Sequence, residues 1–88
     1  MTDIKKIVLD VLKPHQPSIV ELSRRLAALH GVVGVNCMID DKITLEGTAI
    51  DYEKVEATVR ALGAVIHSID SVSAGKKIVD ATKTPQDL

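Results

Sequence analysis

Two aspartates and a histidine are the residues of this sequence best suited to site chemistry, and they lie in segments that otherwise have the pattern of β-strands. Asp10 lies in IKKIVLDVL, and His67 and Asp70 lie in IHSIDSVSAG. Two carboxylates on neighbouring strands repel each other unless a cation, a basic side chain or a proton lies between them. Carboxylate oxygens are the ligands that Ca²⁺ and Mg²⁺ prefer, and imidazole is a common metal ligand. We therefore predict a divalent-cation site at Asp10 and Asp70, with His67 as a third candidate ligand.

The same residues have a simpler interpretation. Each carboxylate could be solvated, or could bind a lysine or a backbone N–H of a neighbouring subunit, because charged groups on a sheet are ordinarily paired. Strict alternation places His67 with Val65 and Ile69, on the strand face opposite Asp70. A histidine in that position serves as a hydrogen-bonded interface residue or as a pH or metal switch.

Hydrophobic periodicity predicts six elements that would position these residues. Strands are predicted at 4–12, 34–40, 43–47 and 66–75. One helix is predicted to follow the capping box of Ser18 and Glu21 and to stop at Gly31, and a second to follow the N-cap Asp51 and stop at Gly63. Each helix carries an apolar stripe with spacings of three, four and three, formed by Ile19, Leu22, Leu26 and Leu29 in the first and by Tyr52, Val55, Val59 and Leu62 in the second.

The order of these elements predicts the fold. Two successive strand-helix-strand units predict an α+β protein with the ferredoxin-like βαββαβ plait. Right-handed crossovers and short connections give a four-stranded antiparallel sheet in the order 4-1-3-2, with both helices on one face and the opposite face open.

Alternation along the strands predicts which side chains face the core. Ile7, Leu9 and Val11 share one face of the first strand, and inward positions in the middle strands are predicted for Val35, Cys37, Ile39, Ile43 and Leu45. The open face would be lined by Val8, Leu12, Met38, Ile66 and Val72. An apolar patch of this kind marks an interface more often than a substrate pocket. The last strand, expected at the sheet edge with mixed faces, is predicted to meet another subunit.

Composition limits the class of protein. A chain of 88 residues is expected to form one domain over residues 1–88, with 76–88 as a C-terminal tail or added element. The net charge of −1 and the single aromatic residue, Tyr52, argue against a nucleic-acid partner, which needs a basic surface and stacking platforms. Cys37 is the only cysteine, so a cytoplasmic protein without disulfides is expected. The sequence has no apolar run long enough for a membrane span, and no membrane partner is expected.

Part of the chain resembles the heavy-metal-associated domains of copper chaperones. The resemblance covers residues 26–63, with LHGVVGVN, a short hairpin and DYEKVEATVRALG. It implies the same plait. That family holds metal through two cysteines in the loop after the first strand, whereas this loop reads KPHQPS and offers only His15. One imidazole does not replace two soft thiolates, so copper delivery through this loop is not expected.

A second resemblance covers nearly the whole chain. The blocks IVLDVLKPHQPSI, GVVGVN, IHSIDSVSAGK and TPQD, in that order, are similar to the uncharacterised archaeal family catalogued as domain of unknown function two hundred and eleven. The resemblance implies the plait, a tendency to form homo-oligomers and a suspected role for a divalent metal. It assigns no activity and no site residues.

Three functions are consistent with these observations. The first is a non-catalytic cytosolic homo-oligomer that binds a divalent cation, Ca²⁺ or Mg²⁺, or a small ligand near Asp10 and Asp70. The second is a regulatory module that binds a small molecule between paired plait domains. The third is a metal-dependent phosphodiesterase built on Asp10. Enzyme signatures such as a glycine-rich phosphate loop, His-Glu-x-x-His or a nucleophile elbow are missing from the sequence, so we do not expect an enzyme.

Overall fold

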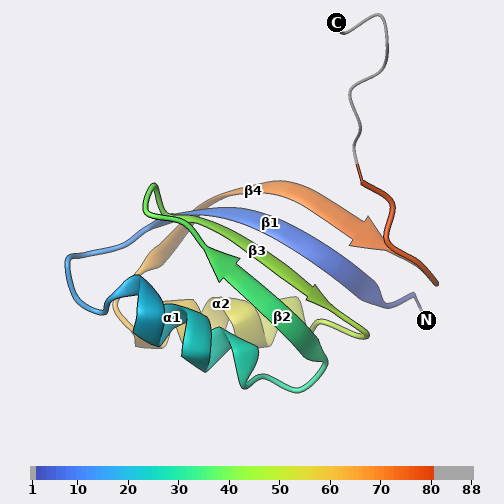
Figure 1. Ribbon diagram of the computed structural model, residues 1–88, viewed down its shortest axis with the longest axis horizontal. Coiled ribbons are helices and arrows are strands. Elements are labelled where there is room, and N and C mark those ends of the chain that lie inside the picture. Colours follow the sequence, from blue (N-terminus) through green and yellow to red (C-terminus); the bar gives the residue numbers. More distant parts are fainter. Residues whose placement is uncertain (1, 81–88) are drawn as a thin grey trace, which may run out of the picture.

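The protein has two layers, a four-stranded sheet and a pair of helices that lie on one of its faces (Figure 1). The computed structural model describes residues 2–80. Its elements, in chain order, are β1 (Ile4–Leu12), α1 (Ile19–Ala27), β2 (Val32–Cys37), β3 (Lys42–Gly47), α2 (Tyr52–Ala61) and β4 (Val65–Ala74). All strand pairs are antiparallel and the sheet order is β2-β3-β1-β4. The predicted α+β plait with strand order 4-1-3-2 is therefore confirmed.

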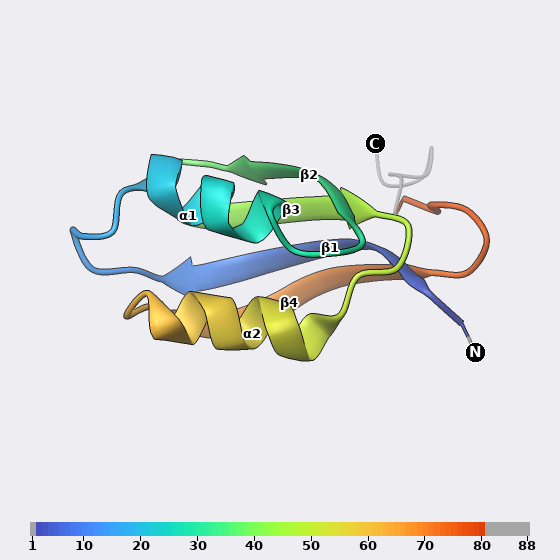
Figure 2. The same ribbon diagram turned by 90° about the horizontal axis from the view of Figure 1, so that it is seen from below.

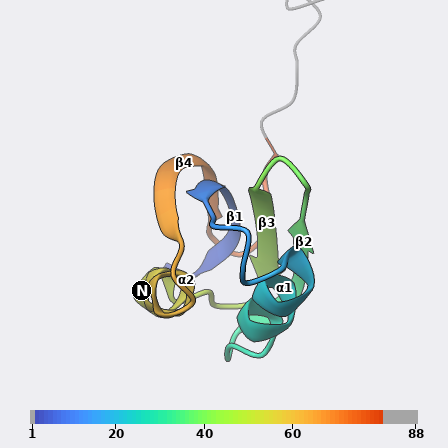
Figure 3. The ribbon, with the colours of Figure 1, turned by 90° about the vertical axis from the view of Figure 1, so that its left-hand side faces the viewer.

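Both helices cover the same face of the sheet. Seen from the helix side, α1 lies over β2 and β3, and α2 lies over β4, with β1 running between the two helices (Figure 2). An end view shows no element of the sheet or helices on the other face (Figure 3). As predicted, no helix or strand of residues 2–80 covers the face opposite the helices, which we call the open face. Within residues 2–80, no helix is both long and apolar enough to cross a membrane.

Both helices begin at the predicted caps. Ser18 Oγ accepts a hydrogen bond from the backbone N–H of Glu21 at 3.2 Å, and Asp51 Oδ1 accepts one from that of Lys54 at 3.3 Å. These bonds satisfy N–H groups that have no partner inside the helix. Helix α1 ends at Ala27, four residues before the predicted stop, because its last residues tighten into a turn before the chain reaches Gly31 at φ 88°.

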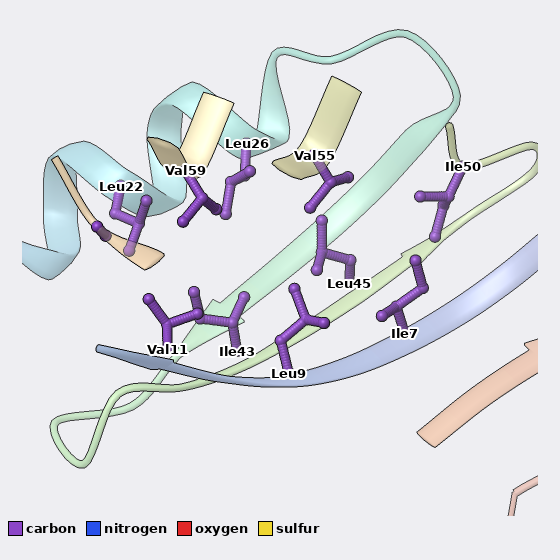
Figure 4. Close-up of a cluster of buried hydrophobic side chains, with 11 residues drawn as sticks. Ile7, Leu9, Val11, Leu22, Leu26, Ile43, Leu45, Ile50, Val55 and Val59 are labelled. Atoms are coloured by element: carbon purple, nitrogen blue, oxygen red, sulfur yellow. The ribbon is translucent and has the colours of Figure 1, made fainter. Parts of the chain in front are cut away.

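The core lies between the helices and the sheet (Figure 4). Its buried side chains are Ile7, Leu9, Val11, Leu22, Leu26, Ile43, Leu45, Ile50, Val55, Val59 and Ala64. The inward faces predicted for β1 and β3 are confirmed, and Val35 and Cys37 of β2 pack partly buried against this core. The prediction for Ile39 is wrong. Strand β2 ends at Cys37, so Ile39 falls in the turn to β3 and is 92% exposed.

Strand β4 does not alternate as predicted, because two of the three register shifts in its pairing with β1 are bulges with an extra residue in β4. Val11 and Asp10 lie opposite Ile66 and Ser68, which leaves His67 as an extra residue.

In the second bulge, Leu9 and Val8 lie opposite Ile69 and Ser71, which leaves Asp70 as the extra residue. Beyond each bulge, the β4 positions whose side chains face the helices shift by one residue in the sequence. The sequence predicts that Val65 and Ile69 share a face with His67. In the structure, Val65 and Ile69 instead lie opposite β1 residues that belong to different faces of the sheet.

The bulges overturn two predictions for the open face. Ile66 lies opposite Val11 and packs against the core, and Val72 lies opposite the buried Ile7. Both therefore belong to the helix side, since directly opposite residues share a face. The exposed Leu12 is on the open face as predicted, because it follows the core residue Val11 in an alternating strand.

The chain turns back over the open face after β4. Lys6 Nζ on β1 contacts Asp80 Oδ1 at 2.5 Å, and the backbone N–H of Val79 donates to Ser73 Oγ at 2.8 Å. These contacts bury Ser73, although it lies on an edge strand. Residues 76–80 are thus the described part of the predicted tail, and 81–88 lie outside the described residues.

Candidate functional site

Three neighbouring strands place a group of polar side chains at one end of the open face. Asp10 on β1 lies directly opposite Lys42 on β3, and on its other side directly opposite Ser68 on β4. Asp70 belongs to this group because the second bulge turns its side chain toward Lys42. The adjacent core residues Leu9 and Ile43 point to the helix side, so alternation directs this group to the open face.

The two carboxylates meet at one amino group. Lys42 Nζ donates a hydrogen bond to Asp70 Oδ2 and lies 4.0 Å from Asp10 Oδ2. Ser68 Oγ donates to the other oxygen of Asp70 at 2.7 Å. The side chains of Asp10 and Asp70 are 31% and 32% exposed, so they remain in contact with water. With two carboxylates and one ammonium, the group carries a formal charge of −1.

The charges of this group perturb each other's protonation. The hydrogen bond from Lys42, followed by that from Ser68, holds the pKa of Asp70 below its ordinary value. The hydrogen bond to Asp70 raises the pKa of Lys42, and the nearby charges of Asp10 and Asp40 act in the same direction. Partial burial opposes both shifts. Asp70 and Lys42 are therefore both charged at neutral pH, and neither is a proton donor or acceptor suited to catalysis near pH 7.

Exposed apolar side chains surround the charged group. Leu12 follows Asp10 by two residues and lies opposite Val65 on β4, and both are exposed. Met38 is also exposed, and its backbone N–H donates to the carbonyl of Lys42 at 2.8 Å. A partner covering this end of the sheet would therefore bury apolar surface around the ion pair, where Coulomb interactions are stronger than in water.

The structure brings two of the three predicted site residues together. Asp10 and Asp70 share Lys42, whereas His67 is an exposed residue at the neighbouring bulge, near enough for its charge to contribute to the lowered pKa of Asp70. Among residues 2–80, no group of three or more His, Cys, Asp or Glu side chains is arranged to hold a metal ion. The cation site at Asp10, Asp70 and His67 stays a prediction.

Sequence reasoning missed Lys42 and Ser68. Lys42 precedes the inward Ile43 and could have been assigned to the open face by alternation. The predicted strand order then places it beside Asp10. The signal for Ser68 was weaker, because the bulges determine which face of the sheet its side chain occupies.

A shallow depression of about 250 Å³ lies elsewhere on the open face, over β2 and β3. It is lined by Val33, Gly34, Val35, Asn36, Thr44 and Glu46. A Cβ atom added at Gly34 would meet no atom within 4 Å, so the missing side chain helps to form the hollow.

Comparison with known proteins agrees with the resemblance expected from the sequence. An uncharacterized protein of Methanocaldococcus jannaschii is 41% identical over 95 aligned residues, which cover 99% of this chain and 98% of that protein. Residues 5–88 match the family described as "Uncharacterized ArCR", the domain of unknown function two hundred and eleven. The chain carrying this open-faced plait, with its paired aspartates on β1 and β4, belongs to that family.

Proposed function

We propose that this protein is a small, non-catalytic homo-oligomer that binds a divalent cation between Asp10 and Asp70. The observation that carries the proposal is the convergence of both carboxylates on the amino group of Lys42. In the proposed bound state, the ion takes the place of this ammonium while Lys42 turns toward solvent.

The ligand atoms favour a hard cation. Asp10 and Asp70 supply four carboxylate oxygens and Ser68 supplies a hydroxyl beside them. Oxygen donors of this kind suit Ca²⁺ or Mg²⁺, with water completing the coordination. The formal charge of −1 with Lys42 in place becomes −2 when Lys42 withdraws, which favours a dication over a monovalent ion.

Self-association is supported by the distribution of exposed apolar side chains. Among the described residues, Val20 is the one large exposed apolar residue on a helix, and the others lie on strands, the β2–β3 hairpin or the segment after β4. The core is also small and lacks phenylalanine and tryptophan, so a domain of this size gains from burying surface against another copy.

Calorimetric titration of metal-stripped protein with Ca²⁺ and Mg²⁺ tests the cation site. We expect saturable binding that is lost in the double variant Asp10→Asn, Asp70→Asn. Binding should be retained in the control Glu53→Gln, which removes one exposed carboxylate in the first turn of α2. Binding that persists in the double variant, or no heat at millimolar ion, would contradict the cation site.

Sedimentation velocity tests self-association separately. We expect a species larger than the 9.5 kDa monomer at micromolar concentration. A monomer across the micromolar range would contradict the homo-oligomer and would leave the calorimetric result unaffected.

A small-molecule regulatory module is the second candidate function, supported by the depression at Gly34. Its lining offers the amide of Asn36, the hydroxyl of Thr44 and the carboxylate of Glu46 within an otherwise apolar hollow. Such a mixture suits a small metabolite with an amino or hydroxyl group. Thermal unfolding in the presence of a panel of amino acids tests this function, since a ligand of the native state raises the melting temperature. Gly34→Leu should abolish any such shift by filling the hollow.

A further inference from the structure

The two edges of the sheet differ in their capacity to pair with another strand. The edge strand β4 contains two bulges and the ionisable residues His67 and Asp70, and it curves strongly (Figure 3). Bulges and charges are features that prevent strand addition. The edge strand β2 carries no charged residue and pairs regularly with β3 from Gly34 to Cys37. Among the elements of residues 2–80, β2 is therefore the edge strand with a regular and unpaired outer side.

Hydrogen bonding within the sheet indicates which groups of β2 face outward. The N–H of Met38 donates to the carbonyl of Lys42 at 2.8 Å, so this pair is of the hydrogen-bonded type. Antiparallel ladders alternate between hydrogen-bonded and non-hydrogen-bonded pairs. Asn36 consequently bonds to β3, while the N–H and C=O groups of Val35 and Cys37 point away from β3. No strand formed by residues 2–80 pairs with these groups, which form a row of donors and acceptors along the edge.

Exposed apolar residues lie at both ends of this edge. Val33, at a bulge near the start of β2, is 76% exposed, and Ile39, just beyond its end, is 92% exposed. They are equally distant in sequence from Asn36. Because an antiparallel two-fold pairing sets each end of a strand against the opposite end of its copy, an axis at Asn36 brings Val33 to the partner's Ile39.

We propose that two copies of this chain pair along β2 in antiparallel fashion, with the two-fold axis at Asn36. In this register Val35 lies opposite the partner's Cys37, so the outward N–H and C=O groups of both strands bond each other. The partner's Asn36 lies across the axis in a non-hydrogen-bonded pair, with the two side-chain amides side by side on the open face. The outward groups of Val35 and Cys37 permit any register whose two-fold axis passes through a residue of β2. The exposed apolar ends, Val33 and Ile39, select Asn36 among these positions.

This inference rests on the proposed self-association and is independent of cation binding. It predicts that Asn36→Cys, made together with Cys37→Ser, forms a disulfide across the axis. The Cα atoms of a non-hydrogen-bonded pair are about 4.5 Å apart, within the range that a disulfide spans.

The matched control is Thr44→Cys in the same Cys37→Ser background. Thr44 lies directly opposite Asn36 on the same face but one strand further from the axis. We expect Asn36→Cys to double the apparent mass on a non-reducing gel under oxidised glutathione, at least about tenfold faster than Thr44→Cys. Equal rates for the two variants would overturn the proposed register.

A second measurement does not depend on cysteine chemistry. Val33→Lys places a charge on the edge and should raise the dissociation constant of the self-associated form at least about tenfold. Val20→Lys makes the same change at an exposed site on α1 and should leave it unchanged. If both lysine variants self-associate like the parent, the edge is not used, even though the protein is an oligomer. If the parent is a monomer, the proposed self-association fails as well.

Discussion

Lys42→Met tests whether Lys42 competes with a cation for Asp10 and Asp70. Methionine keeps an unbranched side chain but removes the ammonium that lies 4.0 Å from Asp10 and hydrogen-bonds Asp70. A unit charge at about 4 Å changes an equilibrium by about fivefold even at the dielectric constant of water, and a dication couples more strongly. We therefore expect Ca²⁺ and Mg²⁺ affinity to rise at least about fivefold. The effect should persist at 0.1 M salt, because 4.0 Å is well below the screening length of about 10 Å.

Isothermal titration calorimetry of parent and variant measures this change. The matched control is Lys6→Met, which removes a lysine of the same strand face whose partners are Asp80 and Glu46. Lys6 lies four residues from Asp10 along β1, about 13 Å at the rise of a strand, so its removal should change affinity less than twofold. Weaker or unchanged binding in Lys42→Met would refute the view that the ammonium occupies the cation position, and would assign Lys42 to the site as a structural partner of the carboxylates.

Three further predictions concern stability. The pKa of Asp70 is lowered from 3.8 in the folded protein, so the ionised carboxylate stabilises the fold above that value, and this contribution is lost as the pH falls through the native pKa. The melting temperatures of parent and Asp70→Asn should therefore converge in acid. A difference that stays constant with pH would contradict the ion pair. Gly31→Ala should cost at least about 2 kcal/mol in denaturant unfolding at fixed protein concentration, since Gly31 has φ 88° and its new Cβ would lie 2.2 Å from the carbonyl oxygen of Ala49. Gly34→Ala, which meets open space, should be neutral or stabilise by about 0.5 kcal/mol, and similar losses in the two variants would contradict this account. Ser18→Ala should cost about 1 kcal/mol in the same measurement by removing the cap of α1, and no loss would contradict the capping bond.

Local patterns predicted most of the fold because local interactions determine them. The caps Ser18 and Asp51 act on residues three positions away, and the alternation of β1 reports directly on the face that it buries. Local patterns could not predict which side chains of β4 face the helices, since a bulge is a property of two paired strands. A trace of it is nevertheless present in the sequence. Ile66, Ile69 and Val72 recur every third residue, a spacing that does not fit a regular strand and marks the two bulges between them.

The candidate site was predicted in part for a related reason. Asp10 and Asp70 were identified from their charge within apolar strands, which is a local signal. Lys42 is 32 residues from Asp10 in the sequence, and only the order and register of the strands set the two side by side. The carboxylates could therefore be identified from a local signal alone, whereas identifying Lys42 requires the predicted strand order and the alternation of β3 together.

The second bulge of β4 links the candidate site to the proposed assembly. By adding Asp70 to the strand it turns that carboxylate toward Lys42, and it also interrupts the outer edge of β4. A pair of chains joined along β2 would form one sheet whose two outer strands are both β4. Bulged and charged edges resist strand addition. This pairing uses the regular edge of the sheet formed by residues 2–80 and leaves a bulged edge on each side, so it does not continue into a filament. Larger assemblies would then have to form through the faces of the sheet, where Asp10 and Asp70 lie among exposed apolar residues.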